Sequence, residues 1–369
     1  MRLPADFALI AHFETWERAA AAISLLRGPE RPPFSQDDIR DILPWIPPRT
    51  CSRVTVGSLQ GHKANGIYID SFIPPDRLDR HFLRENLARV REAALYAIRE
   101  GARIVTLGGF SSILLEGKTD LLPSHPETSF TTGNTLTVAL IVKGVERALE
   151  LAGCGLDESS ILIVGASGDV GSGCARCLAP GARQLLLCAR NRDRLNKVAA
   201  EFTSLGNRVI ADTDVQRLSR KADLVICAAS LTASGLLLDA LPEGAIVCDA
   251  GYPKNLNADF ARRDCPVFYG GLGQATGGIQ LKPDLLGIVY PYPIPNLTHG
   301  CLLEGVVLAL EQRFEPFSQG RGLITPYGVR EIWSMAQKHG IGLPPLFNGK
   351  GLVEDEMLRL RRAVPPWTR

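Results

Sequence analysis

Three regularly spaced glycines follow an apolar run near the middle of the chain. The run ILIVGA covers residues 161–166, and Gly165, Gly168 and Gly171 lead from it into a segment with a helical pattern. In a strand–turn–helix unit, one such glycine permits the tight turn, the next lets the backbone approach a pyrophosphate, and the third lets the helix pack on the strand. The helix N-terminus adds free N–H groups and the positive end of its dipole. The pattern predicts a bound dinucleotide; an ordinary turn is the alternative.

The end of the next apolar run indicates which dinucleotide is bound. After residues 184–189 the chain reads Asn191 between two arginines, Arg190 and Arg192, where NAD-specific sites usually place an acid that binds the ribose 2′-hydroxyl. The forked, permanently charged arginine side chain suits a 2′-phosphate instead. The sequence therefore favours NADPH, with a solvated helix start as the alternative. The complete predicted cofactor site is Gly165, Ser167, Gly168, Asp169, Val170, Gly171, Arg190, Asn191, Arg192, Ala229 and Ser230.

One cysteine stands at the predicted start of a long apolar helix. Cys301 follows the proline-rich segment PYPIPNLTHG and precedes the apolar run. With Thr298 as the N-cap, Cys301 falls in the first helical turn, where free N–H groups and the helix dipole lower the pKa of a thiol. This position predicts a nucleophile, and a small packed residue is the alternative. His299 is a candidate acid–base partner, although on a helix it does not share a face with Cys301.

The other cysteines give weaker signals. Cys188, Cys227 and Cys248 lie inside apolar runs and are expected in the core. Cys174 and Cys177 have the C-x-x-C spacing, but they fall inside the helix after the glycine turn, and no second pair completes a zinc site. Packing is therefore favoured over metal or redox chemistry, and no metal is expected. The motifs G-x-S-x-G and H-E-x-x-H do not occur, so the hydrolase and zinc-enzyme classes lose their usual support.

The elements that position these residues alternate regularly in the middle of the chain. Apolar runs lie at 161–166, 184–189, 223–228 and 245–250. Such alternation predicts βαβ units and a doubly wound parallel sheet covered on both faces. The predicted fold is α/β, with an N-terminal α/β substrate domain (1–155), a central Rossmann-like NADP-binding domain (156–290), and a C-terminal helical segment (291–369) that contains Cys301.

Composition narrows the possible partners and compartment. The 369 residues include 41 Lys+Arg and 39 Asp+Glu, a net charge of +2, which is too even a balance for a nucleic-acid-binding field. No run of apolar residues is long enough for a transmembrane segment, and Asp6, His12 and Glu14 interrupt the position of a secretion signal. We therefore expect a cytoplasmic protein with reduced cysteines.

Several unusual stretches occur in a fixed order along the chain. They are FALIAHF (7–13), GIYIDSFIPP (66–75), TLGGFSSI (106–113), FTTGNTLT (130–137), VGASGDVGS (164–172), CARNRDRL (188–195) and DAGYPKNL (249–256). Through them, and through the helix that begins near Cys301, the sequence resembles the cyanobacterial acyl-carrier-protein reductases, NADPH-dependent enzymes that make long-chain fatty aldehydes. The PYPIPNLTHG approach to Cys301 differs from the cyanobacterial segment.

The resemblance implies that Cys301 forms a thioester with the acyl chain, which NADPH then reduces to the aldehyde. The implied substrate is acyl carrier protein or acyl-CoA bearing a fatty chain, and an aldehyde-consuming enzyme is a possible partner. The predicted catalytic residues are Cys301, Lys254, Tyr252 and His299, and the predicted substrate contacts are Gly109, Phe110, Thr132 and Asn134. For Lys254, Tyr252 and Asn134, turn or cap chemistry is the alternative.

Two features of the implied site have structural alternatives. The small polar residues 131–135 are interpreted as a pocket lip, with helix capping as the simpler explanation for part of the run. An acyl channel beside Leu302, Leu303, Val306 and Leu310 shows the same apolar stripe as an ordinary core helix.

Two other functions stay open from the sequence. One is an NADP-dependent alcohol or polyol dehydrogenase of the shikimate dehydrogenase type, which transfers hydride without covalent catalysis. The other is a non-enzymatic NADPH-binding sensor or scaffold.

Overall fold

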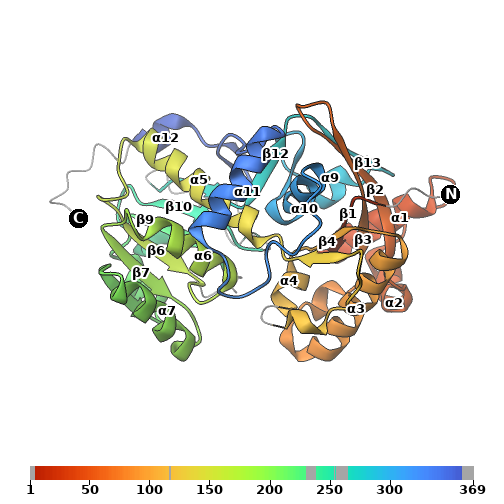
Figure 1. The fold of residues 1–369 in the computed structure, drawn as a ribbon, viewed down its shortest axis with the longest axis horizontal. Helices are drawn as coiled ribbons and strands as arrows, with labels where there is room; N and C mark the ends of the chain where they lie inside the picture. The colour runs from red at the N-terminus through yellow and green to blue at the C-terminus, as the bar shows by residue number, and fades with distance from the viewer. Residues whose placement is uncertain (1–4, 116–117, 230–237, 253, 255–264, 360–369) are drawn as a thin grey trace. The chain divides into compact units, whose positions relative to one another are not determined.

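In a computed structural model, the structure describes residues 5–115, 118–229, 238–252, 254 and 265–359. The chain divides into two units, neither of which is one continuous stretch (Figure 1). Unit 1 consists of residues 1–136, 273–320 and 332–342, and unit 2 of residues 137–272, 321–331 and 343–369. This division differs from the predicted boundaries after residues 155 and 290, because the segment 291–369 contributes to both units. Local patterns do not reveal that a late segment returns to pack with an early sheet.

Unit 1 is built on a mixed sheet. Its strands are β1 (Phe7–Ala11), β2 (Arg49–Gly57), β3 (Lys63–Asp70), β4 (Ile104–Leu107), β5 (Ser129–Thr131) and β13 (Ile279–Lys282). They are ordered β13-β2-β3-β1-β4-β5. Strands β3, β1, β4 and β5 run parallel, whereas β2 pairs antiparallel with β3 and with β13. The late strand β13 thus completes a sheet formed by the first part of the chain.

A helix packs against each face of this sheet: α3 (Leu83–Arg99) is buried on one side only, whereas α10 (Gly300–Leu310) is buried along most of its length. Alternate residues of β1, β3 and β4 form one core with α3, in which Ile69 and Val105 pack with Val90 and Ala94. The other face carries α10, where Gly305 lies beside Thr106 of β4. Successive strand residues point to opposite faces of the sheet. A residue's position along its strand therefore determines whether it packs against α3 or α10. Helix α10 is also apolar apart from Glu304, which together with its burial is typical of a core helix.

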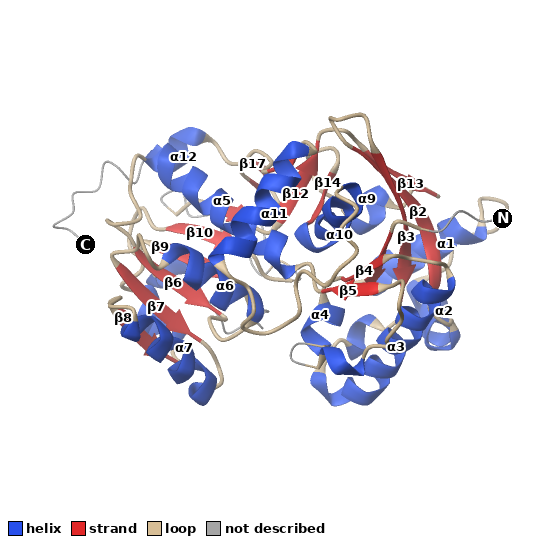
Figure 2. Ribbon diagram, in the orientation of Figure 1, coloured by secondary structure: helices blue, strands red, loops and turns tan. Residues whose placement is uncertain are grey.

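Unit 2 contains a fully parallel sheet. Its strands are β6 (Ser160–Val164), β7 (Gln184–Cys188), β8 (Val209–Asp212), β9 (Leu224–Cys227), β10 (Ile246–Asp249) and β11 (Val267–Tyr269). The order β11-β10-β9-β6-β7-β8, with every pair parallel, is the strand order of a Rossmann dinucleotide-binding domain. Figure 2 shows helices beside these strands, including α6 (Asp169–Leu178) and α7 (Arg192–Ser204). The predicted α/β class and doubly wound parallel sheet are confirmed.

The remaining elements connect and flank the two sheets. The helices are α1 (Trp16–Arg27), α2 (Gln36–Ile42), α4 (Phe110–Leu114), α5 (Asn134–Ala152), α8 (Val215–Ser219), α9 (Leu286–Val289), α11 (Pro326–Lys338) and α12 (Asp355–Arg359). The short strands are β12 (Leu272–Ala275), β14 (Leu297–His299), β15 (Ile341–Gly342), β16 (Phe347–Asn348) and β17 (Gly351–Leu352). Among the described residues, no helix combines the length and apolar character needed to cross a bilayer.

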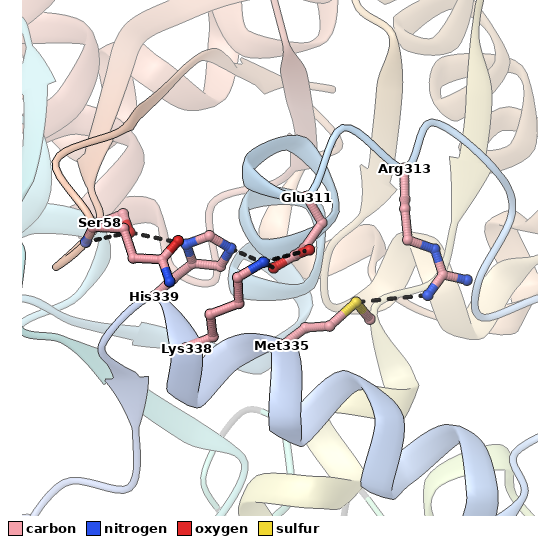
Figure 3. Close-up of polar contacts among 7 residues, drawn as sticks. Ser58, Glu311, Arg313, Met335, Lys338 and His339 are labelled. Atoms are coloured by element: carbon pink, nitrogen blue, oxygen red, sulfur yellow. Dashed lines mark hydrogen bonds and ion pairs between the residues drawn. The ribbon is translucent and has the colours of Figure 1, made fainter.

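A polar cluster joins three distant segments of unit 1 (Figure 3). The Nδ1 atom of buried His339 lies 2.8 Å from Ser58 Oγ, and its Nε2 atom lies 2.7 Å from Glu311 Oε1. Lys338 Nζ also donates to Glu311 at 2.8 Å. The cluster therefore links the turn after β2 to the C-terminal ends of α10 and α11. Burial raises the pKa of Glu311, but the hydrogen bonds from Lys338 and His339 outweigh burial and keep it below its usual value.

Candidate active site

Cys301 lies in the first turn of α10, as the sequence predicts, but with a different cap. Thr298 belongs to strand β14, and the N-cap is His299, whose side chain makes no capping hydrogen bond. The prediction of Thr298 as the N-cap was wrong, because the extended backbone continues through 297–299 before the helix begins. Cys301 therefore follows directly on the end of a strand, with part of its surface accessible.

Backbone amides surround the Cys301 sulfur. The N–H groups of Gly109 and Leu302 hydrogen-bond to it and lower its pKa, but burial has the larger effect and raises the pKa to about 11. The sequence predicted that the helix dipole and free N–H groups lower the pKa of this thiol; the amides do so, but burial outweighs them and the net shift is upward. Removal of the sulfur from water raises its pKa by more than the hydrogen bonds from the two amides lower it. At neutral pH the residue is a thiol beside donors that suit an anion.

The turn that supplies Gly109 is held by a neutral histidine. Gly109 has φ 53° and precedes α4, and the next amide, Phe110 N–H, donates to His12 Nε2 at 3.0 Å. Burial lowers the pKa of His12 to about 4, so the ring is neutral at neutral pH and its Nε2 atom can accept this hydrogen bond. His12 was not predicted as a site residue, although a histidine between Ala11 and Phe13 at the end of an apolar strand is a detectable signal.

His299 lies among tyrosines on the segment that approaches Cys301. Tyr292 Oη is 3.1 Å from His299 Nε2, and the ring of buried Tyr290 packs edge-on against the imidazole, with centroids 5.1 Å apart. Tyr292 and His299 belong to the segment PYPIPNLTHG, and Tyr290 directly precedes it. A hydroxyl and an imidazole in contact form a pair that can transfer a proton.

The segment 131–136 passes beside Cys301. A Cβ on Gly133 would lie 2.4 Å from the Cys301 Cα, so the two backbones are in close contact. Thr132 Oγ1 accepts a hydrogen bond from the Asn134 backbone at 3.4 Å, which is the capping interaction proposed as the simpler explanation. Leu302, Leu303 and Val306 are buried, as expected of a core helix.

Glu304, which was not predicted from the sequence, organises this segment. It is fully buried one turn after Cys301. Its carboxylate accepts hydrogen bonds from Thr131 Oγ1 (2.5 Å), Leu136 N (2.9 Å) and Ser318 Oγ (3.0 Å). A single acid inside the apolar run CLLEGVVLAL was the available signal, because an acid is almost never fully buried without partners.

The predicted glycine turn in unit 2 has the geometry that a dinucleotide requires. Gly165 has φ 87°, and a Cβ there would lie 2.7 Å from the Ala228 backbone oxygen. A Cβ on Gly171 would lie 2.3 Å from the Gly165 oxygen. Gly168 is the N-cap of α6 and supplies no side chain to the first-turn amides. The turn follows β6 where the strand order reverses between β6 and β9, which is where such sheets bind ligands.

The other predicted cofactor residues lie at the same ends of the parallel strands. Ala229 follows β9 next to Gly165, and Ser167 and Val170 are partly exposed in the turn and first helical turn. The buried Asp169 carboxylate accepts from Gly322 N at 3.2 Å. Arg190, Asn191 and Arg192 are exposed after β7, and the Asn191 side chain caps α7. Ser230 lies outside the described residues.

Lys254 and Tyr252 follow β10 in unit 2. Lys254 Nζ donates to the backbone oxygens of Asp249 (3.1 Å) and Gly270 (2.8 Å), which joins the ends of β10 and β11. Tyr252 is partly exposed in the turn before it. The two lie with the glycine turn in unit 2, whereas Cys301, His299, Gly109, Phe110, Thr132 and Asn134 lie in unit 1.

Comparison with known proteins identifies the family. No family model matches the chain. The long-chain acyl-[acyl-carrier-protein] reductase of Synechococcus elongatus is 30% identical over 305 residues, which cover 80% of this chain and 87% of the reductase. The chain belongs to this family of reductases. The family resemblance inferred from the sequence motifs is therefore confirmed.

Other similarities are more partial. The aminotransferase PigE of a Serratia species is 29% identical over 272 residues, which cover 72% of this chain and 31% of PigE. The matched region therefore spans about a third of PigE's length. Among solved structures, quinate dehydrogenase from Corynebacterium glutamicum in complex with NAD has a TM-score of 0.36 and 16% identity, covering 72% of this chain and 87% of that chain. The A chain of dipicolinate synthase from Bacillus subtilis has a TM-score of 0.33 and 16% identity, covering 57% and 65%.

Proposed function

We propose that the protein is an NADPH-dependent reductase that converts a long-chain acyl thioester to the aldehyde through a thioester on Cys301. The single observation that supports this most is the position of Cys301, which lies in the first turn of α10 with the amides of Gly109 and Leu302 on its sulfur. Membership of a family whose relative is named for reducing long-chain acyl-[acyl-carrier-protein] supports the substrate class.

In the first step, the Cys301 sulfur bonds to the acyl carbonyl carbon and the bond from that carbon to the carrier sulfur breaks. The carrier leaves as a thiol and takes up one proton. Covalent capture divides one difficult reaction into two easier steps. Because the pKa of Cys301 is raised to about 11, its proton needs an acceptor, and we assign this to His299 with Tyr292 behind it.

The same backbone amides have a second task in this proposal. The tetrahedral intermediate develops a negative charge on the carbonyl oxygen, and donors fixed before the reaction stabilise such a charge most effectively. The N–H groups of Gly109 and Leu302 are fixed by the turn before α4 and by the start of α10. His12 holds the turn by accepting from Phe110, and the side chain of Phe110 then borders the acyl site.

The cofactor is assigned to the glycine turn of unit 2, where Gly165, Gly168 and Gly171 leave room for the pyrophosphate. When bound, NADPH supplies the hydride that reduces the acyl carbon. Arg190 and Arg192 hold the 2′-phosphate, while Ser167, Asp169, Val170, Asn191, Ala229 and Ser230 complete the site. Tyr252 and Lys254 are assigned to the nicotinamide side, and Thr132 and Asn134 to the substrate. A cytoplasmic location and an aldehyde-consuming partner belong to the same proposal.

Intact-protein mass spectrometry with a long-chain acyl-CoA or acyl carrier protein, without NADPH, tests the proposal. We expect an added acyl mass on the native protein, none on Cys301→Ala, and aldehyde release when NADPH is added. Cys154→Ala is the matched control, because Cys154 is also partly exposed but lies after α5. A fully active Cys301→Ala enzyme without any adduct would instead support a non-covalent dehydrogenase. NADPH binding without turnover of any acyl thioester would support a sensor.

A further inference from the structure

Glu304 is a buried acid whose partners all donate to it. Thr131 Oγ1 accepts from Ser318 N at 2.9 Å, so its own proton points to Glu304 Oε1. Ser318 Oγ accepts from Thr135 N at 3.0 Å, lies 2.6 Å from Thr135 Oγ1 and donates to Glu304 Oε2 at 3.0 Å. Glu304 Oε2 also receives Leu136 N–H. A buried carboxylate is tolerated when several donors replace its water. Glu304 is thus the common acceptor of a fully buried network.

The network fixes both ends of one short segment. Thr131 is the last residue of β5, and Leu136 lies in the first turn of α5, whose leading N–H groups have no partner within the helix. The carboxylate of Glu304 supplies a partner from another helix, and its negative charge suits the positive end of α5. The residues between these two contacts are therefore held against α10.

Gly133 lies in the middle of the fixed segment and touches Cys301. Its φ of 72° and its close approach to the Cys301 Cα, Cβ and backbone oxygen leave no space for a side chain. Glu304 itself lies three residues after Cys301 on α10, on neighbouring positions of the helix surface. One acid therefore connects the cysteine's own helix to the backbone that covers the cysteine.

We propose that Glu304 is a positioning residue for Cys301, which holds residues 131–136 so that Gly133 keeps the sulfur aligned for acyl transfer. This inference rests on the proposed function. Glu304 does not act as the base for the thiol, because its oxygens already accept from Thr131, Leu136 and Ser318. Its effect reaches the reaction through the backbone that it anchors.

The substitution Glu304→Gln tests the inference, because the amide NH₂ group meets donors where the carboxylate accepted them. We expect the rate of Cys301 acylation, followed by mass spectrometry in a single turnover with a long-chain acyl-CoA, to fall at least tenfold. KM for the thioester and Kd for NADPH should change less than threefold. Glu311→Gln is the matched control, since it removes an acid from the same helix without touching residues 131–136; its acylation rate should stay within twofold of the native rate.

A second variant separates the anchoring contact from the charge. Thr131→Val deletes the hydrogen bond to Glu304 together with the one from Ser318 N, and it keeps the carboxylate. It also serves if Glu304→Gln does not fold. We expect acylation at least fivefold slower in Thr131→Val. The midpoint of the pH profile for Cys301 alkylation should move down in Glu304→Gln, where the charge is lost, and stay in place in Thr131→Val. Native-like acylation in Thr131→Val, or equal slowing by Glu311→Gln, would overturn the inference.

Alkylation also separates this inference from the proposed function. If the native protein forms no acyl adduct, the proposed function fails. The anchoring is then judged from the rate at which iodoacetamide alkylates Cys301, compared between proteins at the same thiolate fraction of Cys301. Loss of the anchor uncovers the sulfur, so both variants should react at least threefold faster than the native protein. Unchanged alkylation in both variants would overturn the anchoring as well.

Discussion

Gly133 packs against Cys301 so closely that a Cβ on the glycine would lie 2.4 Å from the Cys301 Cα and 2.7 Å from its backbone oxygen. Backbone at that distance cannot move aside as the end of a flexible side chain can. The first turn of α10 and the segment leading into α5 are thus fitted to one another. Gly133 is the glycine of the FTTGNT motif, so the motif places a residue without a side chain at this contact.

Replacement of Gly133 by alanine should destabilise the protein and prevent acylation. The positive φ costs a non-glycine residue about 1 to 2 kcal/mol, and the overlap with Cys301 adds about 1 to 3 kcal/mol. Gly206→Ala is the control, because Gly206 has φ 85° with nothing within 4 Å of its Cβ position. Urea denaturation should show a clearly larger loss for Gly133→Ala; equal losses would show that only backbone strain matters.

Alkylation of Cys301 should be slow at neutral pH and rise steeply with pH. Because its pKa is raised to about 11, the thiolate fraction grows about tenfold for each pH unit between pH 7 and 9. Iodoacetamide labelling followed by peptide mapping measures the rate at Cys301 separately from the other cysteines. A plateau below pH 9 would contradict the predicted protonation state.

Asp70 should make the protein less stable as the pH rises. Its side chain is fully buried at the end of β3, Oδ1 accepts from Phe72 N, and Oδ2 has no hydrogen-bond partner in the part of the chain that the structure describes. Burial raises the pKa to about 8, whereas the unfolded value is near 3.8. The folded state therefore holds the extra proton between these values, and stability falls as pH increases through that window, by up to about 5 kcal/mol.

The substitution Asp70→Asn removes this pH dependence. At pH 8 the variant should unfold at a higher temperature than the native protein, because the amide requires no ionisation. At pH 4 both proteins carry a neutral group and the difference should nearly vanish. Thermal unfolding followed by circular dichroism across this range provides the measurement, and an Asn variant that is less stable at pH 8 would refute the assignment.

Arg190 should determine the choice of nicotinamide cofactor. It is exposed directly after β7 in unit 2. Replacing it with aspartate removes a charge-assisted contact to a 2′-phosphate and supplies an acceptor for a 2′-hydroxyl. We expect Kd for NADPH to rise about tenfold to a hundredfold, at about 1.4 kcal/mol per factor of ten, and Kd for NADH to fall. Fluorescence titration measures both; Arg217→Asp, another exposed arginine of unit 2, serves as the control.

Regular periodicity made the nucleotide-binding sheet predictable. The four apolar runs correspond to β6, β7, β9 and β10, each within two residues of the predicted ends. Strand β8 was not predicted because it is only partly buried, and β11 because it has only three residues. The glycine turn was found because its residues are close together along the chain. Local pattern is sufficient where neighbours in sequence are also neighbours in space.

The surroundings of Cys301 were less predictable, for a physical reason. The position of Cys301 follows from helix signals, but its pKa depends on Gly109, which is distant in sequence, and on burial. His12, Glu304 and Gly133 reach the site from three separate segments. Their roles come from tertiary contacts, which a single sequence does not encode as a local pattern. The family motifs indicate which segments make such contacts, but not which residues contact one another.

The raised pKa of Cys301 also bears on how readily its sulfur is oxidised. Peroxides attack thiolates, and oxidation proceeds through sulfenic acid to sulfinic and sulfonic acids that are largely irreversible. A sulfur kept in its protonated form is a poor target for that damage. The burial that slows the reactions of Cys301 at neutral pH should therefore also slow its oxidation by peroxides.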